Sequence, residues 1–222
     1  MGWSVKFQVE ICFMILAFFY GELACASQRE DALAVAIIQE MNLARRNPAR
    51  YAGYIEELRQ NYNAGFAVLP TGTKWRMKEG LRAIDEAASF LRAAHPEQPL
   101  RLSPGMCRSA ADHCADQAGG RTGHGGSDRS SPRSRLGRYG SWTGPWGENI
   151  AYGKTTARDI VITLIIDDGN SARPHRKNIF NSDFNYAGAA CGPHARYGSV
   201  CTIDFVHGYL ERSSAPASTS AR

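Results

Sequence analysis

The first half of the chain carries apolar residues that recur three and four positions apart, which is the spacing of one helical face. This pattern predicts a helix over residues 31–46 and another over residues 79–94. Pro48 follows the first and can begin a further helix, because its fixed torsion angle suits the first helical turn. Ser103 precedes a proline and predicts the N-cap of a helix that ends near Gln117.

Two segments lack a regular pattern and are expected to be loops. Residues 61–77 are punctuated by Gly and Asn, and residues 119–147 are rich in Gly, Ser, Arg and Pro. A loop as long as the second is uncommon in a compact domain and tends to be functional.

Shorter elements follow the long loop. We expect a strand over residues 148–152, then a helix that begins with a capping pattern at Thr156, then a turn that contains His175. The runs 186–191 and 200–206 are typical of strands and are joined by a turn that contains Gly and Pro. The order of elements therefore combines early helices with a late pair of strands.

Four cysteines lie beyond residue 26, and their spacing predicts one disulfide. Cys191 and Cys201 flank the turn between the last two strands, where antiparallel pairing brings Cα atoms within the roughly 4.4–6.8 Å of a disulfide. Cys107 and Cys114 lie on one predicted helix and are separated by about 10.5 Å along its axis, which is too far to bridge. We expect both to be buried thiols, and no CxxC pattern indicates a cysteine zinc site.

The N-terminus has the features of an export signal. The apolar run 11–20 is about half as long as a membrane span, and the sequence Ala-Cys-Ala at 24–26 fits the small-x-small rule of signal cleavage. The sequence therefore predicts a signal peptide over 1–26, one domain over 27–212 and a disordered tail over 213–222. We expect a secreted protein in an oxidising compartment, where disulfides persist.

Composition indicates a basic globular domain. The chain has 222 residues, of which 43% are hydrophobic and 21% are charged, and its formal net charge is +5. These values exclude a disordered or fibrous protein. No second apolar stretch of about 20 residues follows the signal, so no transmembrane segment is expected after cleavage.

Two of the histidines occupy contexts that favour chemistry. His124 lies in a flexible Gly-rich stretch, and His175 follows a proline. Glu148 begins a predicted strand, and Asp167 and Asp168 end the apolar helix before His175. Two imidazoles and two carboxylates in one pocket can bind a divalent cation such as zinc, form a structural hydrogen-bond network or carry out acid–base catalysis. Spacing alone does not show that these side chains converge.

Four motifs in this order resemble the CAP superfamily, also called the SCP domain, of cysteine-rich secretory, antigen 5 and pathogenesis-related proteins. They are residues 41–52 (MNLARRNPARYA), 123–124 (GH), 147–153 (GENIAYG) and 175–179 (HRKNI). The chain is most similar to the compact secreted microbial forms, which have no cysteine-rich C-terminal extension. The resemblance implies an α+β fold, namely a three-layer α-β-α sandwich with a mainly antiparallel central sheet.

The resemblance also implies a cleft with two histidines and two acidic residues, which in some members binds zinc or another divalent cation. His124 and His175 match the histidines and would be the metal ligands, and Glu148 matches the first glutamate. Asp167 stands where the family has the second glutamate, and Asp168 is the neighbouring candidate. The carboxylates would hold the second ring nitrogen of a histidine or a metal-bound water.

Other positions modify this expectation. Asn149 is expected to hydrogen-bond the backbone beneath the site. Pro174 stands where the family has glycine, and its fixed torsion angle is expected to aim His175 differently. The four site residues fit a buried polar network that fixes the loop to the sheet as well as they fit a metal site.

The resemblance implies a secreted, non-catalytic binding module. Its ligand would be a lipid, a sterol or an extracellular molecule bound through a divalent cation, and its setting would be host interaction or defence. The alternative is a metal-dependent, peptidase-like hydrolase in which Glu148, His124 and His175 are catalytic. Against it, the sequence contains neither His-Glu-x-x-His nor Gly-x-Ser-x-Gly.

A third hypothesis concerns the charge of the expected loop 119–147. It carries three aromatic residues, Tyr139, Trp142 and Trp146, and such a basic and aromatic loop can contact an acidic surface. Its arginines are Arg121, Arg129, Arg133, Arg135 and Arg138. Arginine is the dominant basic residue of the whole chain, so this loop is less distinctive than it first suggests. We expect no nucleic-acid partner, because the chain carries an export signal.

Overall fold

The computed structural model describes residues 32–212, and a sheet of four strands forms its middle layer. The strand order is β3-β5-β6-β4. β3 (Arg101–Leu102) runs parallel to β5 (Tyr186–His194), whereas β6 (Gly198–Glu211) pairs antiparallel with both β5 and β4 (Gly140–Tyr152). The sheet is therefore mainly antiparallel, and β4 lies along one edge.

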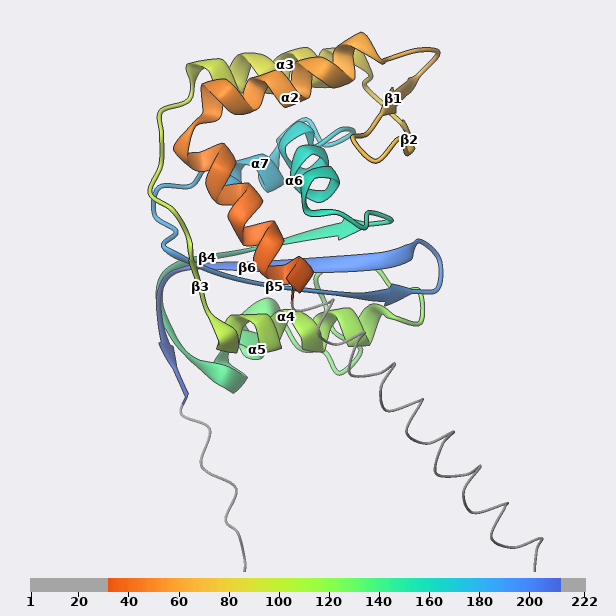
Figure 1. Cartoon of the computed structure of the whole chain (residues 1–222). Helices are drawn as coiled ribbons and strands as arrows, with labels where there is room; N and C mark the ends of the chain where they lie inside the picture. Colours follow the sequence, from red (N-terminus) through yellow and green to blue (C-terminus); the bar gives the residue numbers. More distant parts are fainter. Residues whose placement is uncertain (1–31, 213–222) are drawn as a thin grey trace, which may run out of the picture.

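Helices cover both faces of the sheet (Figure 1). One face carries α4 (Pro104–Gln117) and α5 (Pro132–Tyr139). The other carries a helix over residues 32–46 together with α2 (Pro48–Gln60), α3 (Leu81–Ala93), α6 (Ala157–Ile166) and α7 (Pro174–Ile179). The expected α+β class, a three-layer α-β-α sandwich, is confirmed.

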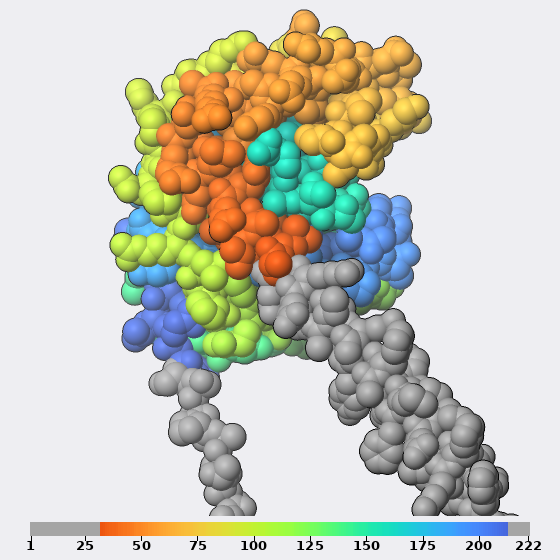
Figure 2. Space-filling view, in the orientation of Figure 1, coloured from red at the N-terminus to blue at the C-terminus, as the bar shows by residue number. Residues whose placement is uncertain are grey.

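The two faces of the sheet are packed differently. The large apolar core lies on the side of residues 32–46, α2, α3 and α6, where side chains such as Ile37 and Phe205 are fully buried. On the face in Figure 2, residues 32–46 lie against α6, and the segment around residues 66–76 lies beside them. Under α4 and α5 the apolar clusters are small, so buried polar residues fill much of that second interface.

Local capping signals place the helices where the sequence predicts them. The side chain of Ser103 accepts a hydrogen bond from the Met106 N–H at the start of α4. Thr156 does the same for the Asp159 N–H at the start of α6, and Pro48 opens α2. Each capping oxygen satisfies an N–H that has no partner within its own helix, which explains why these starts can be identified from sequence.

Both expected loops contain regular structure, so those predictions were wrong. Residues 61–77 contain an antiparallel hairpin of β1 (Phe66–Val68) and β2 (Lys74–Arg76), whose turn includes Gly72 in a left-handed conformation with φ of 81°. Residues 119–147 contain α5 and the first half of β4. The start of α5 carries the same Ser-Pro signal as α4, because Ser131 caps it and Pro132 opens it.

Three further elements differ from the sequence-based expectation. His175 lies in the short helix α7 instead of a turn, because Pro174 occupies its first position. β5 and β6 are longer than expected and form one hairpin whose turn comprises residues 195–197. β3 was not predicted, because a strand of two residues has no detectable period.

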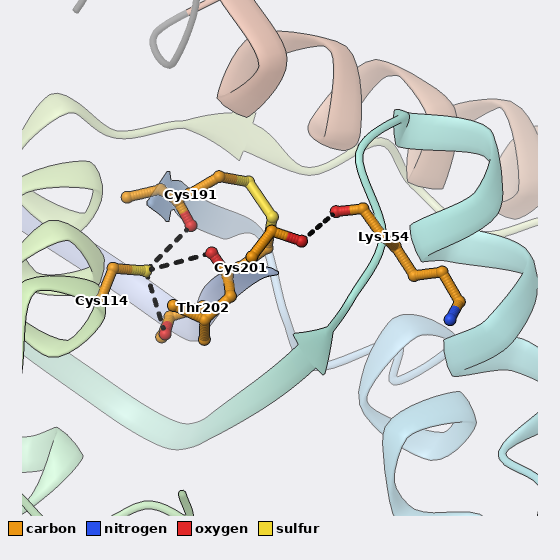
Figure 3. Close-up of a disulfide and its surroundings, with 8 residues drawn as sticks. Cys114, Lys154, Cys191, Cys201 and Thr202 are labelled. Carbon is orange, nitrogen blue, oxygen red and sulfur yellow. Dashed lines mark hydrogen bonds between the residues drawn. A yellow bond between two sulfur atoms is a disulfide. The ribbon is translucent and has the colours of Figure 1, made fainter. Parts of the chain in front are cut away.

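The disulfide between Cys191 and Cys201 is confirmed (Figure 3). The two residues are directly opposite in the β5–β6 hairpin. Cys114 is buried beside them and donates a hydrogen bond to the carbonyl of Ala190 at 3.2 Å. Burial raises the pKa of the Cys114 thiol to about 11, so the thiol stays protonated. Cys107 is half-buried, which corrects the expectation that both thiols are buried.

The expected signal peptide over 1–26 and the expected tail over 213–222 lie outside the described residues. The start of the predicted domain, residues 27–31, lies outside them as well. Within 32–212, none of the helices has the length and apolar character needed to cross a membrane.

A fully buried cation joins the first helix to two distant segments. The guanidinium of Arg45 donates to the main-chain carbonyls of Gln98, Ile179, Asn181 and Phe184 at distances of 2.8, 2.7, 3.0 and 3.3 Å. These carbonyls belong to the segment before β3, to the last residue of α7 and to the connection between α7 and β5. One side chain therefore satisfies backbone groups that no helix or strand would pair.

We predict that Arg45→Leu lowers the free energy of unfolding by about 3–5 kcal/mol, because it leaves several buried carbonyls without a donor. Urea unfolding followed by circular dichroism measures the change. The control is Arg46→Leu, since Arg46 is the exposed neighbour that bonds only within its own helix. Equal stabilities of the two variants would show that the buried contacts contribute nothing.

Candidate functional site

Glu148 lies on β4 with its carboxylate buried, and two cationic or ionisable groups approach it. The Nδ1 atom of His124 lies 2.7 Å from its Oε1 atom. The Nη2 atom of Arg135 donates to its Oε2 atom at 2.6 Å. Because a carboxylate only accepts hydrogen bonds, the contact with His124 places the ring proton on Nδ1. The glutamate therefore holds His124 in one tautomer and one orientation.

Arg135 fixes the loop that carries His124 as well as the charge of Glu148. Its Nη1 and Nη2 atoms both lie 3.2 Å from the carbonyl oxygen of His124, and Nη1 also reaches the carbonyl of Ser130 at 3.3 Å. The Arg135 residue is only 1% exposed. It therefore faces the interior and is not part of a basic surface on the former loop 119–147.

A second group of hydrogen bonds holds the same loop from α4. His113 Nε2 lies 2.8 Å from the carbonyl oxygen of Gly123, and Gln117 donates to the same oxygen at 2.9 Å. The Tyr152 hydroxyl accepts from the Gly123 N–H at 3.0 Å and donates to Gln117 at 2.7 Å. Burial lowers the pKa of His113, so its imidazole is neutral near pH 7.

These supporting residues were missed at the level of sequence, although α4 contains a signal for them. Ser109, His113 and Gln117 are each four residues apart, so they share one helical face. All three are buried. A polar stripe on the buried face of a helix indicates a hydrogen-bonding partner across the interface.

His175 is paired with Asp167 on the opposite face of β4. Its Nδ1 atom lies 2.7 Å from Asp167 Oδ1, and its backbone N–H donates to Asp167 Oδ2 at 2.9 Å. Asp167 ends α6 in a left-handed conformation with φ of 53°. This backbone position brings the shorter aspartate side chain to the histidine.

The neighbouring Asp168 has a different role. Its two carboxylate oxygens accept from the backbone N–H groups of Lys78 and Glu79, at 2.6 and 2.8 Å. These contacts fix the segment before α3 to the end of α6. Of the two aspartates, Asp167 is the one that contacts His175.

Asn149 connects the second pair to the sheet. Its side-chain amide donates to the carbonyl of His175 at 3.0 Å, and its oxygen accepts from Asn178 at 2.8 Å. Since side chains alternate along a strand, Glu148 and Asn149 point to opposite faces of β4. The four site residues therefore form two separate pairs, one on each face of the edge strand.

A cleft of about 260 Å³ lies beside the second pair. Asp167, Asp168 and His175 line it, together with Trp75, Tyr152 and Lys154. Figure 3 shows the Lys154 side chain extending away from the disulfide. Burial lowers the pKa of Lys154. Tyr152 lines this cleft and also contacts the loop that carries His124, because its hydroxyl accepts a hydrogen bond from the Gly123 N–H.

The donor chemistry at the two histidines suits a cation. In each ring a carboxylate holds Nδ1, which leaves Nε2 facing away from that partner and is the usual arrangement of metal-binding histidines. Among residues 32–212, however, no group of three or more His, Cys, Asp or Glu side chains is arranged to hold a metal ion. A cation at either ring would therefore have fewer than three protein ligands of these types among the described residues.

We predict that Arg135→Met lowers the free energy of unfolding by about 3–5 kcal/mol, because it leaves the buried Glu148 carboxylate without its cation. The matched control is Arg133→Met on the same helix, where the guanidinium is exposed and lies 4.9 Å from the Trp142 ring centroid. Chemical unfolding of both variants measures the difference. Similar losses would argue against a special role for the buried pair.

Comparison with known proteins identifies a matching family and several similar solved structures. The chain matches the family model of the cysteine-rich secretory protein family, CAP, over residues 50–205. No curated protein matches the chain. Among solved structures it is similar to an extracellular SCP-domain protein from Bacillus anthracis, with 19% identity and a TM-score of 0.41 over 58% of this chain and 40% of that chain.

Two other solved structures are similar at the same level. An outer surface protein from Borrelia burgdorferi shares 15% identity with a TM-score of 0.42, over 50% of this chain and 78% of that chain. A cysteine-rich secretory protein from Staphylococcus aureus shares 14% identity with a TM-score of 0.37, over 58% of this chain and 38% of that chain. The chain thus covers less than half of the Bacillus and Staphylococcus chains. Because the family model spans most of the sequence, the chain belongs to the CAP family of cysteine-rich secretory proteins.

Proposed function

We propose that this protein is a secreted, non-catalytic binding module whose ligand is a lipid with one long apolar chain. The observation that carries the proposal is an apolar cavity of about 370 Å³, a size typical of small-molecule sites. The disulfide between Cys191 and Cys201 and membership of a secretory family support an extracellular setting.

The cavity lies between the start of the helix over residues 32–46, α4 and β5. Small and apolar side chains dominate its lining, among them Ala34, Val35, Leu102, Pro104, Ala111 and Ala189. Val35 and Leu102 at its edge are 40% and 42% exposed. An apolar ligand would cover these two side chains and remove them from water.

Arg108, a positively charged residue in the lining of the cavity, indicates that the ligand carries a negative charge. Arg108 lines the cavity, and its guanidinium lies 5.1 Å from the Tyr139 ring centroid. Its nearest carboxylate oxygen, on Glu211, is 3.8 Å away and also accepts from the Gly105 N–H. Arg108 therefore retains capacity to pair with an anion, which favours a fatty acid or another anionic lipid over a neutral sterol.

We predict that Ala111→Trp weakens binding of a fluorescently labelled long-chain fatty acid by about tenfold or more, because the indole fills the cavity. Ala115→Trp is the matched control, since Ala115 is exposed one turn further along α4 and does not line the cavity. Fluorescence titration measures both affinities. Wild-type affinity in the Ala111→Trp variant would rule out this cavity as the binding site.

A second proposal concerns the histidines. Each ring is oriented through Nδ1 by a carboxylate, and this arrangement favours a divalent cation at Nε2. We predict that Zn²⁺ produces a binding heat in titration calorimetry and that His124→Ala combined with His175→Ala abolishes it. A His95→Ala variant controls for the loss of an ordinary histidine. Unchanged heats in the double variant would contradict zinc binding at these rings.

The alternative of a peptidase-like hydrolase that uses Glu148, His124 and His175 stays a prediction. Both oxygens of Glu148 are already engaged, by His124 and by Arg135. A carboxylate bound in this way suits a holding role better than the role of a general base, which needs an oxygen that can take a proton from water.

A further inference from the structure

A second carboxyl group is buried directly opposite Glu148. Glu148 on β4 and Asp204 on β6 are register partners in the antiparallel pair. Opposite residues of such a pair project to the same face of the sheet, so both carboxyls lie under α4 and α5. Asp204 is fully buried and Glu148 is 6% exposed. Two carboxylates so close together in a dry interface cannot both remain ionised at low energetic cost.

The two carboxyls differ in the charge and number of their hydrogen-bonding partners, and this difference determines which of them holds a proton. Glu148 has Arg135 and His124 on its two oxygens. Asp204 has only a neutral donor, the Ser109 hydroxyl, at 2.8 Å from its Oδ2 atom. Its Oδ1 atom is buried and takes no hydrogen bond from any residue in 32–212. A proton on Oδ1 would turn this unsatisfied acceptor into a donor, and the carboxylate of Glu148 belongs to the residue directly opposite in the sheet.

The electrostatic surroundings of Asp204 also favour its protonated form. Burial raises the pKa of Asp204 well above its usual range, and the charge of Glu148 raises it further. Ser109 and Arg135 oppose these effects but do not reverse them. The proton therefore lies on Asp204 over the range in which an exposed aspartate is ionised.

The other titratable groups near the pair do not supply a counter-charge to Asp204. His113 on α4 lies 4.0 Å from Glu148 and is neutral because of its burial. The Cys114 thiol on the same helix stays protonated. Tyr209, farther along β6, has a raised pKa and is an uncharged phenol at neutral pH.

We propose that Asp204 is held as a neutral carboxylic acid at neutral pH and positions Glu148 by donating a hydrogen bond to it. Glu148 then has three partners, namely the acid, the guanidinium and the imidazole. Asp204 is a positioning residue in this arrangement, because it reaches His124 only through Glu148. The proposal is independent of the lipid and zinc proposals above.

The pH dependence of stability follows from the location of the proton. In the unfolded chain an aspartate loses its proton near pH 4, whereas folded Asp204 keeps it to a higher pH. Between these two pKa values the folded state binds one more proton, so stability falls as the pH rises. The contribution is complete below the unfolded pKa and is lost as the pH rises to the folded pKa.

Asp204→Asn tests this relation, because the amide keeps the donor and the acceptor but cannot ionise. We expect the ratio of the wild-type folding constant to that of the Asp204→Asn variant to fall about tenfold per pH unit above pH 5, until the folded pKa is reached. Urea unfolding at a series of pH values gives this ratio. The control is Asp183→Asn at an exposed aspartate, for which the ratio to wild type is expected to stay constant over the same range.

Carboxyl ¹³C NMR of the wild-type protein provides a second measurement that does not depend on the stability of a variant. The Asp204 carboxyl carbon is expected to keep the chemical shift of a protonated acid at pH 6. A constant ratio of folding constants together with an ionised Asp204 signal at pH 6 would overturn the proposal.

Discussion

The buried charge of Glu148 is the constraint on which the candidate site depends. A carboxylate under α4 and α5 has lost its water, and it is stable there only with partners that replace it. Arg135 supplies the opposite charge, and the same guanidinium holds the carbonyl of His124. Placing one glutamate in the sheet therefore determines the position of α5, the course of the loop before it and the orientation of the histidine.

The interfaces on the two faces of the sheet differ in how many polar groups they bury and in how those groups are hydrogen-bonded. On the side of α2, α3 and α6 the core is apolar. There the guanidinium of Arg45 donates hydrogen bonds to main-chain carbonyls. On the side of α4 and α5 the apolar clusters are small, and Ser109, His113 and Gln117 supply hydrogen bonds instead. Stability on the first side comes from apolar burial, whereas on the second it requires that every polar partner be present.

Features encoded by a few adjacent residues could be predicted from the sequence, and features that depend on distant partners could not. The cap at Ser103, the start of α6 and the disulfide needed only local spacing. The first half of β4 looks like a loop because its Gly and Pro residues obscure the period, and it is a strand because β6 extends to pair with it. The motifs located His124 and Glu148, but the buried role of Arg135 depends on a fold that brings α5 to the sheet.

The helix α4 joins the two regions to which we assign binding roles. One of its faces carries Arg108 and Ala111 to the apolar cavity. Another carries Ser109, His113 and Gln117, which contact Asp204 and the loop of His124. Because a helix moves as a rigid unit, any displacement of α4 by a ligand in the cavity would also strain the hydrogen bonds on its second face. The cavity and the pair of His124 and Glu148 therefore share α4 as a common supporting helix.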